Sequence, residues 1–226
     1  MVKRKVRRVP EIITEEQLKK IIIEIAKTEK NKFIAMRNVM MFLMGYYLGL
    51  RPGEIRCIKI SDINFENQTL FIPAENNKQR NEENDFPLPD FIIDLLSNYI
   101  KNIPFKTAWL FPCYWNRERK KDVPVHRRVH QKAFTEVARR LGMLRVSYID
   151  EQGKPRYNLT LYSFRHRFGD YCYEKFNYDI KKTAMMLRHY DASCKTTLRY
   201  VHTANRVKRR ELMNEIYPSE ISGELV

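Results

Sequence analysis

The segment "NVMMFLMGYYLGL" (38–50) limits the possible folds of this chain more than any other part of the sequence. It is almost wholly apolar and belongs to a helix predicted over 31–48. The helix is expected to end at Gly49, because glycine adopts the left-handed conformation that closes a helix, and Arg51-Pro52 then begins a short new turn. A helix that is apolar on all sides is buried among other elements. The sequence therefore predicts a core built around 31–48.

The periodicity elsewhere predicts further helices and a small sheet. In "ITEEQLKKIIIEIAK" (13–27), Thr14 and Gln17 have capping-box spacing, and apolar residues follow at the positions of an amphipathic helix. Residues 63–88 alternate short apolar runs with Asn-rich turns, which favours antiparallel strands. A second hairpin is expected before 161, with its turn at 152–155. Further helices are expected at 89–101, 125–141, 161–176, 178–187, 193–200 and 203–216.

These elements define the fold class as mainly α with a small antiparallel β-sheet (α+β). At 226 residues the chain is long enough for one sizeable core, and it contains no internal repeat or low-complexity linker. We expect a basic arm at 1–9, followed by a single domain at 10–226.

The charge of the chain indicates a polyanionic partner. Its 42 Lys and Arg against 27 Asp and Glu leave a net charge of +15, and the excess is concentrated in residues 115–145. Such a field attracts nucleic acid, whose phosphates would release counterions on binding, although a charge run can also be a plain solvated face. The candidate DNA-binding residues are Arg117, Arg119, Lys120, Lys121, Arg127, Arg128, Lys132, Arg139 and Arg140.

The cysteines and the hydropathy profile favour a cytoplasmic protein associated with DNA. The four cysteines are scattered, with no CxxC pair and no histidine at the spacing of metal ligands, so neither a zinc site nor a disulfide framework is indicated. No run approaches the 18 or so apolar residues that span a membrane, and the basic start lacks the apolar region of a signal peptide. We expect no metal, no cofactor and no membrane partner.

The stretch "LTLYSFRHRF" (159–168) combines a core face with an unusual set of polar residues. Thr160 can cap a helix here. On that helix the polar groups share one side, and the alternative is an exposed basic face with snorkelling arginines. The polar side holds Tyr162, Arg165, His166 and Gly169, and the apolar side holds Phe164, Phe168, Tyr171 and Cys172.

Four segments, in this order, resemble motifs of the tyrosine recombinase/integrase family, the DNA-cutting relatives of type IB topoisomerases. "GLRPGEI" (49–55) resembles the first-arginine motif, with Arg51 and its acidic neighbour Glu54. "ENNKQRNEENDFPLP" (75–89) resembles the hairpin of the catalytic lysine, here Lys78. "LTLYSFRHRF" resembles the HxxRH motif, with Arg165. "LRHYDASCKTTLRYVH" (187–202) resembles the segment that carries a histidine and the nucleophilic tyrosine.

The last segment makes His189 and Tyr200 the matching residues, and the resemblance covers about 10–215. Four departures from the family pattern accompany it. Tyr162 replaces the first histidine of HxxR, and Arg188 replaces the glycine that commonly precedes the second histidine. The gap from His189 to Tyr200 is about two residues longer than usual. The N-terminal core-binding domain that completes a clamp around DNA is expected to be absent.

The resemblance implies a phosphodiester cleavage that needs neither metal nor ATP. Two guanidiniums, Arg51 and Arg165, would stabilise the non-bridging oxygens, since each can grip two oxygens and stays charged. Tyr200 would attack and leave a 3′-phosphotyrosine, and His189 would hydrogen-bond the phosphate unless it merely caps a helix. Lys78 would donate a proton to the leaving 5′ oxygen. Lys59 and Arg80 are the alternatives for that role.

Tyr162 and His166 have supporting roles in this scheme. An unperturbed phenol has a pKa of about 10, which suits a general base poorly. We therefore expect Tyr162 to orient the phosphate through its hydroxyl, or simply to be packed, while His166 or water removes the proton from Tyr200.

The predicted function is that of a site-specific DNA recombinase or integrase. It would act on double-stranded DNA as a homotetramer, with the segment after Tyr200 docking onto a neighbour, and be a monomer in solution. One alternative is a DNA-binding accessory protein with the same fold and impaired catalysis, and another is a monomeric DNA-relaxing enzyme like a type IB topoisomerase. Covalent trapping on DNA, salt-sensitive binding without an adduct, and supercoil relaxation distinguish the three.

Overall fold

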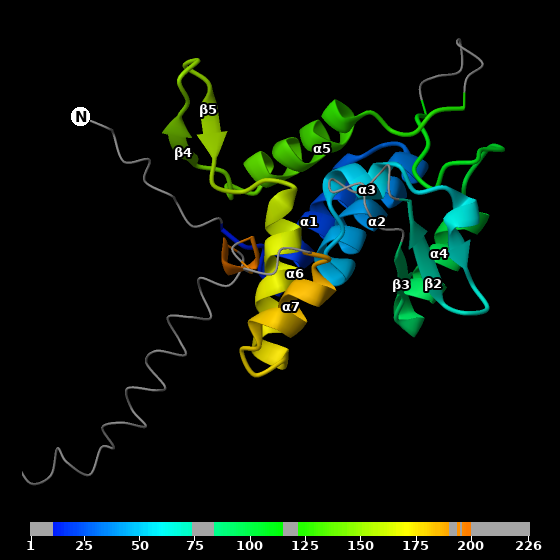
Figure 1. Cartoon of the computed structure of the whole chain (residues 1–226). Helices are drawn as coiled ribbons and strands as arrows, with labels where there is room; N and C mark the ends of the chain where they lie inside the picture. The colour runs from blue at the N-terminus through cyan, green and yellow to red at the C-terminus, as the bar shows by residue number, and fades with distance from the viewer. Residues whose placement is uncertain (1–10, 74–83, 115–121, 190–193, 195, 200–226) are drawn as a thin grey trace, which may run out of the picture.

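The computed structural model describes residues 11–73, 84–114, 122–189, 194 and 196–199, and these form a helical body with two small sheets (Figure 1). The described helices are α1 (Glu15–Thr28), α2 (Lys32–Leu48), α3 (Pro52–Arg56), α4 (Asp90–Lys101), α5 (Arg127–Arg140), α6 (Tyr162–Lys175) and α7 (Ile180–Met186). Short 3-10 turns occur at η1 (Ile60–Asp62) and η3 (Thr197–Arg199). The strands are β1 (Ile63–Asn64), β2 (Thr69–Ile72), β3 (Asn84–Pro87), β4 (Val146–Ile149) and β5 (Pro155–Tyr157).

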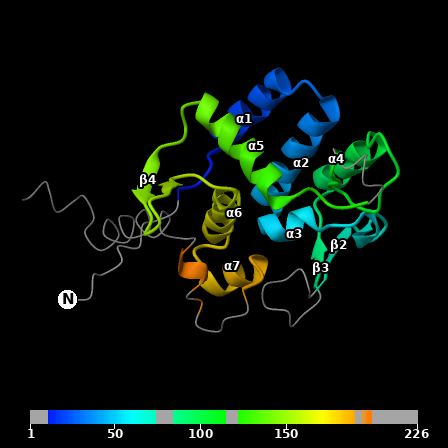
Figure 2. The same ribbon diagram turned by 90° about the horizontal axis from the view of Figure 1, so that it is seen from above.

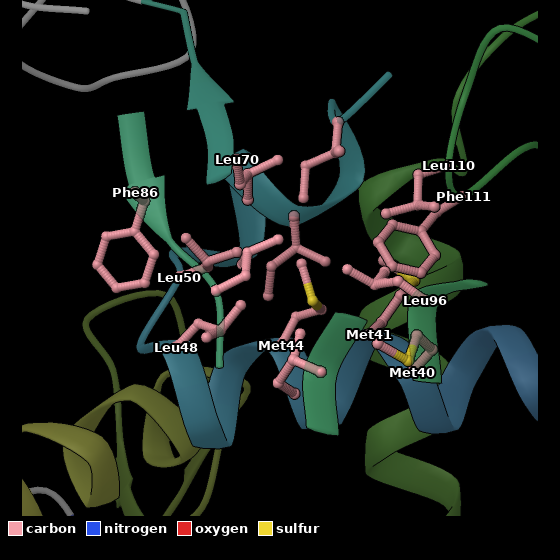
Figure 3. Packing of buried hydrophobic residues seen from close by; sticks show 14 of the residues in the cluster. Met40, Met41, Met44, Leu48, Leu50, Leu70, Phe86, Leu96, Leu110 and Phe111 are labelled. Atoms are coloured by element: carbon pink, nitrogen blue, oxygen red, sulfur yellow. The ribbon is translucent and has the colours of Figure 1, made fainter. Parts of the chain in front are cut away.

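Helix α2 lies between two hydrophobic cores, as its apolar sequence predicts. The first core contains Met40, Met41 and Met44 of α2 together with Leu70 and Phe86 of the β2–β3 pair (Figure 3). This core also takes in α4 and the segment that carries Leu110 and Phe111. Burial of apolar surface stabilises a fold by about 25 cal/mol per Å², and α2 contributes in this way on both of its sides.

The second core joins the opposite side of α2 to α1, α5 and α6. Phe42 stacks on Phe164 of α6, with ring centroids 5.1 Å apart, and Phe134 of α5 meets both rings edge-on. Gly45 lets α6 approach closely, because a Cβ there would lie 3.2 Å from the Cβ of Phe164. Helix α6 is therefore held firmly against α2.

Most of the predicted elements are confirmed. Helix α1 begins with the predicted capping box, in which Thr14 and Gln17 each accept a hydrogen bond from the other's backbone N–H. Strands β1, β2 and β3 form an antiparallel sheet in sequence order. The second hairpin forms too, but its turn starts earlier than predicted: Asp150 accepts from the N–H groups of Gln152 and Lys154, and Pro155 already belongs to β5.

The end of α2 matches the prediction closely. Gly49 has φ +60°, the left-handed conformation in which glycine costs least. A Cβ at this position would overlap the ring of Phe168 on α6. Gly49 therefore sets both the exit of the chain from α2 and its contact with α6.

The elements are arranged so that the chain segments after α2, along α6 and after α7 come together. Figures 1 and 2 show α7 beside α6, with the β2–β3 sheet on the far side of α3. The β4–β5 hairpin lies at the opposite end of the molecule from that sheet. Among the helices of the described ranges, none combines the length and apolar character needed to cross a membrane.

Candidate active site

Arg165 is the centre of a polar cluster formed by three separate chain segments. Its guanidinium donates to the backbone carbonyls of Gly49 and Leu187, and its Nη2 lies 3.1 Å from Nε2 of His189. The side chain is 0% exposed. Arg165 therefore ties α6 to the segment after α2 and to the segment after α7.

The carbonyls that Arg165 contacts explain how a buried cation is tolerated here. Gly49 caps the C-terminal end of α2 and Leu187 caps that of α7. Carbonyls at helix ends lack an intrahelical partner and carry the negative end of the helix dipole. Because a buried guanidinium needs hydrogen-bond acceptors, these two helix ends stabilise its charge.

Arg51 and Glu54 form the second part of the cluster at the start of α3. One carboxylate oxygen of Glu54, Oε1, lies 2.6 Å from Nη1 of Arg51, and the other, Oε2, accepts from the backbone N–H of Arg51 at 2.6 Å. The Arg51 side chain is 14% exposed and that of Glu54 only 2%. Nη2 of Arg51 also reaches the carbonyl of Arg188 at 3.5 Å. Arg51 is therefore the more accessible end of a buried ion pair.

Arg188 is a functional candidate that the sequence motifs did not assign. Its Nη2 lies 2.8 Å from Oε2 of Glu54, and its Cζ lies 4.9 Å from the ring centroid of Phe86. Glu54 is thus shared between two arginines. In the sequence, Arg188 was notable only because it replaces a glycine that is common in the family motif. Nothing in the sequence predicted its contact with Glu54.

His189 is held from both sides of its ring. Nε2 faces Arg165, and Nδ1 lies 3.0 Å from Oγ1 of Thr197 in η3. Because a guanidinium only donates hydrogen bonds, Nε2 acts as the acceptor and Nδ1 carries the proton, which it donates to Thr197. The sequence motifs did not single out Thr197.

Tyr162 and His166 occupy different environments, although both were predicted on the polar side of the helix. Tyr162 is 42% exposed at the first residue of α6. Thr160 accepts from its backbone N–H, although Leu161 is the N-cap residue. Burial, and then the nearby charge of Arg165, lower the pKa of His166 to about 4. The alternative of an exposed basic face fits Tyr162 but not Arg165, because α2 and α7 cover α6 at Arg165.

Several predicted site residues lie outside the described residues: Tyr200, Lys78, Arg117, Arg119, Lys120, Lys121 and Arg80. Lys59 is described and lies with its Nζ 5.8 Å from the ring centroid of Trp109. The remaining candidate DNA-binding residues are exposed along α5, where they leave a cationic surface: Arg127, Arg128, Lys132, Arg139 and Arg140.

Among the described residues, the cluster carries more positive than negative charge. Three arginines, Arg51, Arg165 and Arg188, lie around the carboxylate of Glu54, and all three lower its pKa. Guanidiniums concentrated in this way favour a phosphate-like anion, which they bind in a planar, two-pronged geometry. The arrangement can therefore hold an anion beside Arg51.

We expect Glu54 to make the stability of the fold depend on pH. Burial raises the pKa of Glu54, but Arg188, Arg165 and Arg51 outweigh burial and lower it below 4.5. A carboxyl with a depressed native pKa stabilises the fold above its unfolded pKa, and this contribution is lost as the pH falls through the native pKa. Glu54→Gln should therefore lower the free energy of unfolding at pH 7 by about 3 kcal/mol.

Urea unfolding of both proteins at pH 7 and pH 4 tests this expectation. The difference between wild type and Glu54→Gln should narrow at the lower pH, because pH 4 lies below the pKa of about 4.3 that Glu54 has in the unfolded chain, where the stabilising contribution begins to be lost. Glu66→Gln, a change in the exposed turn after β1, is the control and should leave stability nearly unchanged at both pH values. If the difference in unfolding free energy between wild type and Glu54→Gln is the same at both pH values, the assignment of Glu54 to an ion pair is wrong.

Comparison with known proteins places this arrangement in a family. The phage integrase family model matches residues 11–206. Tyrosine recombinase XerA of Pyrococcus furiosus is 26% identical over 216 residues, which cover 95% of this chain and 65% of the relative. Tyrosine recombinase XerC of Rickettsia canadensis is 24% identical over 202 residues, covering 89% of this chain and 58% of the relative. This chain thus spans less than two thirds of the length of either relative.

Solved structures agree at the level of the fold. XerA recombinase superposes with a TM-score of 0.64 and 17% identity, covering 93% of this chain and 67% of that one. The XerH site-specific recombinase, in a post-cleavage complex with a palindromic difH substrate, superposes with a TM-score of 0.66 and 22% identity, covering 92% and 53%. Because the family model spans Arg51, Arg165 and His189 and most of the residues around them, this chain belongs to the phage integrase family.

Proposed function

We propose that this chain is the catalytic domain of a site-specific DNA recombinase or integrase, which cleaves and rejoins double-stranded DNA through a 3′-phosphotyrosine intermediate. The observation that carries the proposal is the convergence on Arg165: its guanidinium contacts the carbonyls of Gly49 and Leu187 and lies 3.1 Å from His189. Arg51 joins the same cluster through Glu54 and the carbonyl of Arg188.

The proposed chemistry assigns one task to each group. The phenolic oxygen of Tyr200 attacks the phosphorus, and the bond from phosphorus to the 5′ oxygen breaks. Arg51, whose side chain is 14% exposed, stabilises the charge that develops on the non-bridging oxygens, and the positive charge of the buried Arg165 adds to this stabilisation. The leaving 5′ oxygen takes a proton from Lys78 and becomes a hydroxyl. Because the phosphotyrosine bond retains the energy of the broken linkage, rejoining needs no ATP, and the arginines supply the positive charge that a metal would supply.

His166 or water accepts the proton of Tyr200. The pKa of His166 is about 4, so its imidazole is neutral at pH 7 and can accept a proton, although it is a weaker base than an ordinary histidine. Tyr162 is exposed at the start of α6 and can orient the phosphate through its hydroxyl.

Double-stranded DNA would lie against the exposed cations of α5 as well as the arginine cluster. The side chains of Arg127 and Arg128 are exposed at its first turn, and those of Arg139 and Arg140 at its last. Contacts of this kind bind phosphates without reading sequence and weaken as salt concentration rises. We propose assembly as a homotetramer on DNA, with the segment after Tyr200 docking onto a neighbour.

Covalent trapping tests the proposal. A pool of nicked duplexes with random core sequences is incubated with the protein, so that the short cleaved fragment diffuses away and the adduct cannot religate. We expect an SDS-resistant adduct, mapped to Tyr200 by mass spectrometry, and no adduct with Tyr200→Phe. Failure of the wild type to form an adduct, or an undiminished adduct with Tyr200→Phe, would overturn the proposal.

A second candidate function rests on Tyr162, which stands where the family has a histidine. A chain with this replacement can keep the fold and bind DNA as an accessory protein without cutting it. It would show salt-sensitive duplex binding and no covalent product, so a single cleavage event excludes it. Relaxation of supercoiled plasmid by a monomer, without recombinant product, would instead indicate a topoisomerase-like enzyme.

A further inference from the structure

Arg188 has a backbone conformation that disfavours its own residue type. Its φ is +51°, in the left-handed region that glycine adopts more readily than residues with a Cβ. The side chain at this position must therefore offset a backbone cost that glycine would avoid. Its contacts show what it contributes.

The guanidinium of Arg188 is buried against Glu54 and Phe86. Nη2 lies 2.8 Å from Oε2 of Glu54, and Cζ lies 4.9 Å from the ring centroid of Phe86. Arg188 as a whole is 5% exposed. Its backbone carbonyl accepts from Nη2 of Arg51 at 3.5 Å, so this residue contacts both members of the Arg51–Glu54 pair.

We propose that Arg188 is a positioning residue that shares the carboxylate of Glu54 with Arg51, so that Arg51 can turn toward a DNA phosphate while Glu54 stays neutralised. This inference rests on the proposed function. Without Arg188, the departure of Arg51 would leave the buried carboxylate with only the charge of Arg165 nearby, which is costly. With Arg188 in place, the carboxylate keeps an arginine in direct contact, and Arg51 is available to the phosphate.

The geometry assigns Arg188 an indirect role. Its charged group lies over an aromatic ring and bonds to a carboxylate that is only 2% exposed, whereas the Arg51 side chain is 14% exposed. A cation held over a ring and by an acid loses both contacts if it moves to the phosphate. Arg188 therefore acts through Glu54 on Arg51.

The first test replaces Arg188 with the glycine that its backbone conformation favours. Single-turnover cleavage by Arg188→Gly should fall about 10- to 100-fold, the cost typical of losing one charge-assisted hydrogen bond. The duplex dissociation constant should change less than about threefold, and its salt dependence should stay the same, because Arg188 touches no phosphate. A salt slope reduced by about one would instead indicate a direct phosphate contact and overturn the indirect role.

Two further variants separate positioning from structure. Asn177→Gly also places glycine at a left-handed position, φ +51°, at the end of α6, and should leave cleavage unchanged. Arg188→Lys keeps the charge and should restore part of the lost rate. Cleavage by Arg188→Lys that equals that of Arg188→Gly would argue against a role based on the charge at this position.

A double-mutant cycle with Glu54 gives the decisive readout. In Glu54→Gln no carboxylate needs a counter-ion, so adding Arg188→Gly should lower cleavage less than about twofold further. Penalties that simply multiply would mean that Arg188 acts independently of Glu54, and the inference would then fail.

One measurement keeps this inference separate from the proposed function. NMR titration of the Glu54 carboxyl should show a higher pKa in Arg188→Gly than in wild type, because the neighbouring positive charge has been removed. An unchanged pKa overturns the inference whether or not the protein cuts DNA. The proposed function alone fails if wild type forms no adduct while the pKa of Glu54 still rises.

Discussion

Arg165→Lys is expected to reduce DNA cleavage by about 10³-fold, in the range found when a guanidinium that stabilises a phosphoryl transition state is removed. A single ammonium cannot reproduce the planar fork that contacts the carbonyls of Gly49 and Leu187 while also facing His189. The buried carbonyls would lose hydrogen-bond donors, so the free energy of unfolding should also fall by about 2 kcal/mol. Single-turnover trapping and urea unfolding measure the two effects.

Arg167→Lys is the matched control for this change. Arg167 is two residues further along α6, and its Cζ lies 5.3 Å from the ring centroid of Tyr171 near the surface. The same substitution there should change cleavage less than about threefold and stability by no more than about 0.5 kcal/mol. If the two lysine variants behave alike, the central role given to Arg165 is wrong.

Gly49→Ala should lower the free energy of unfolding by about 3 kcal/mol. Two costs add: a residue with a Cβ must adopt φ +60°, and that Cβ would overlap the ring of Phe168. Moving Phe168 aside would shift α6 against α2, and the carbonyl that Arg165 contacts would move with it. We therefore expect cleavage to fall as well, measured beside urea unfolding.

Two other glycines separate these costs. Gly142 has φ +66°, but a Cβ at this position would have no other group within 4 Å, so Gly142→Ala should cost about 1 kcal/mol, from the backbone alone. Gly53 lies in α3, outside the left-handed region and with the same open space, so Gly53→Ala should be neutral or slightly stabilising. Equal losses for Gly49→Ala and Gly142→Ala would show that the contact with Phe168 is unimportant.

The sequence predicted those parts of the fold whose signals are local. The capping box of Thr14 and Gln17, the apolar α2 and the glycine that ends it each lie within a few residues of the structure that they specify. The second hairpin was placed correctly, but its turn was set too late. The side chain of Asp150 accepts two backbone N–H groups there and draws the turn toward itself.

The site was predicted less completely, because its contacts join residues far apart in the chain. Arg165 and Gly49 are 116 positions apart, and Arg188 and Glu54 are 134 apart. Helical periodicity placed Arg165 and Tyr162 on one side of the helix, but it carries no information on which neighbouring helix covers that side. The low pKa of His166 has the same origin, since burial by neighbouring elements is its largest cause.

The contacts of Arg165 also bear on how members of this family lose activity. Because Arg165 joins α6 to the ends of α2 and α7, it stabilises the fold whether or not DNA is cut. We therefore expect a related protein that binds the same DNA without cutting it to keep this arginine. An arginine at this position in a related sequence therefore indicates an intact fold. It does not by itself indicate that the protein cuts and rejoins DNA.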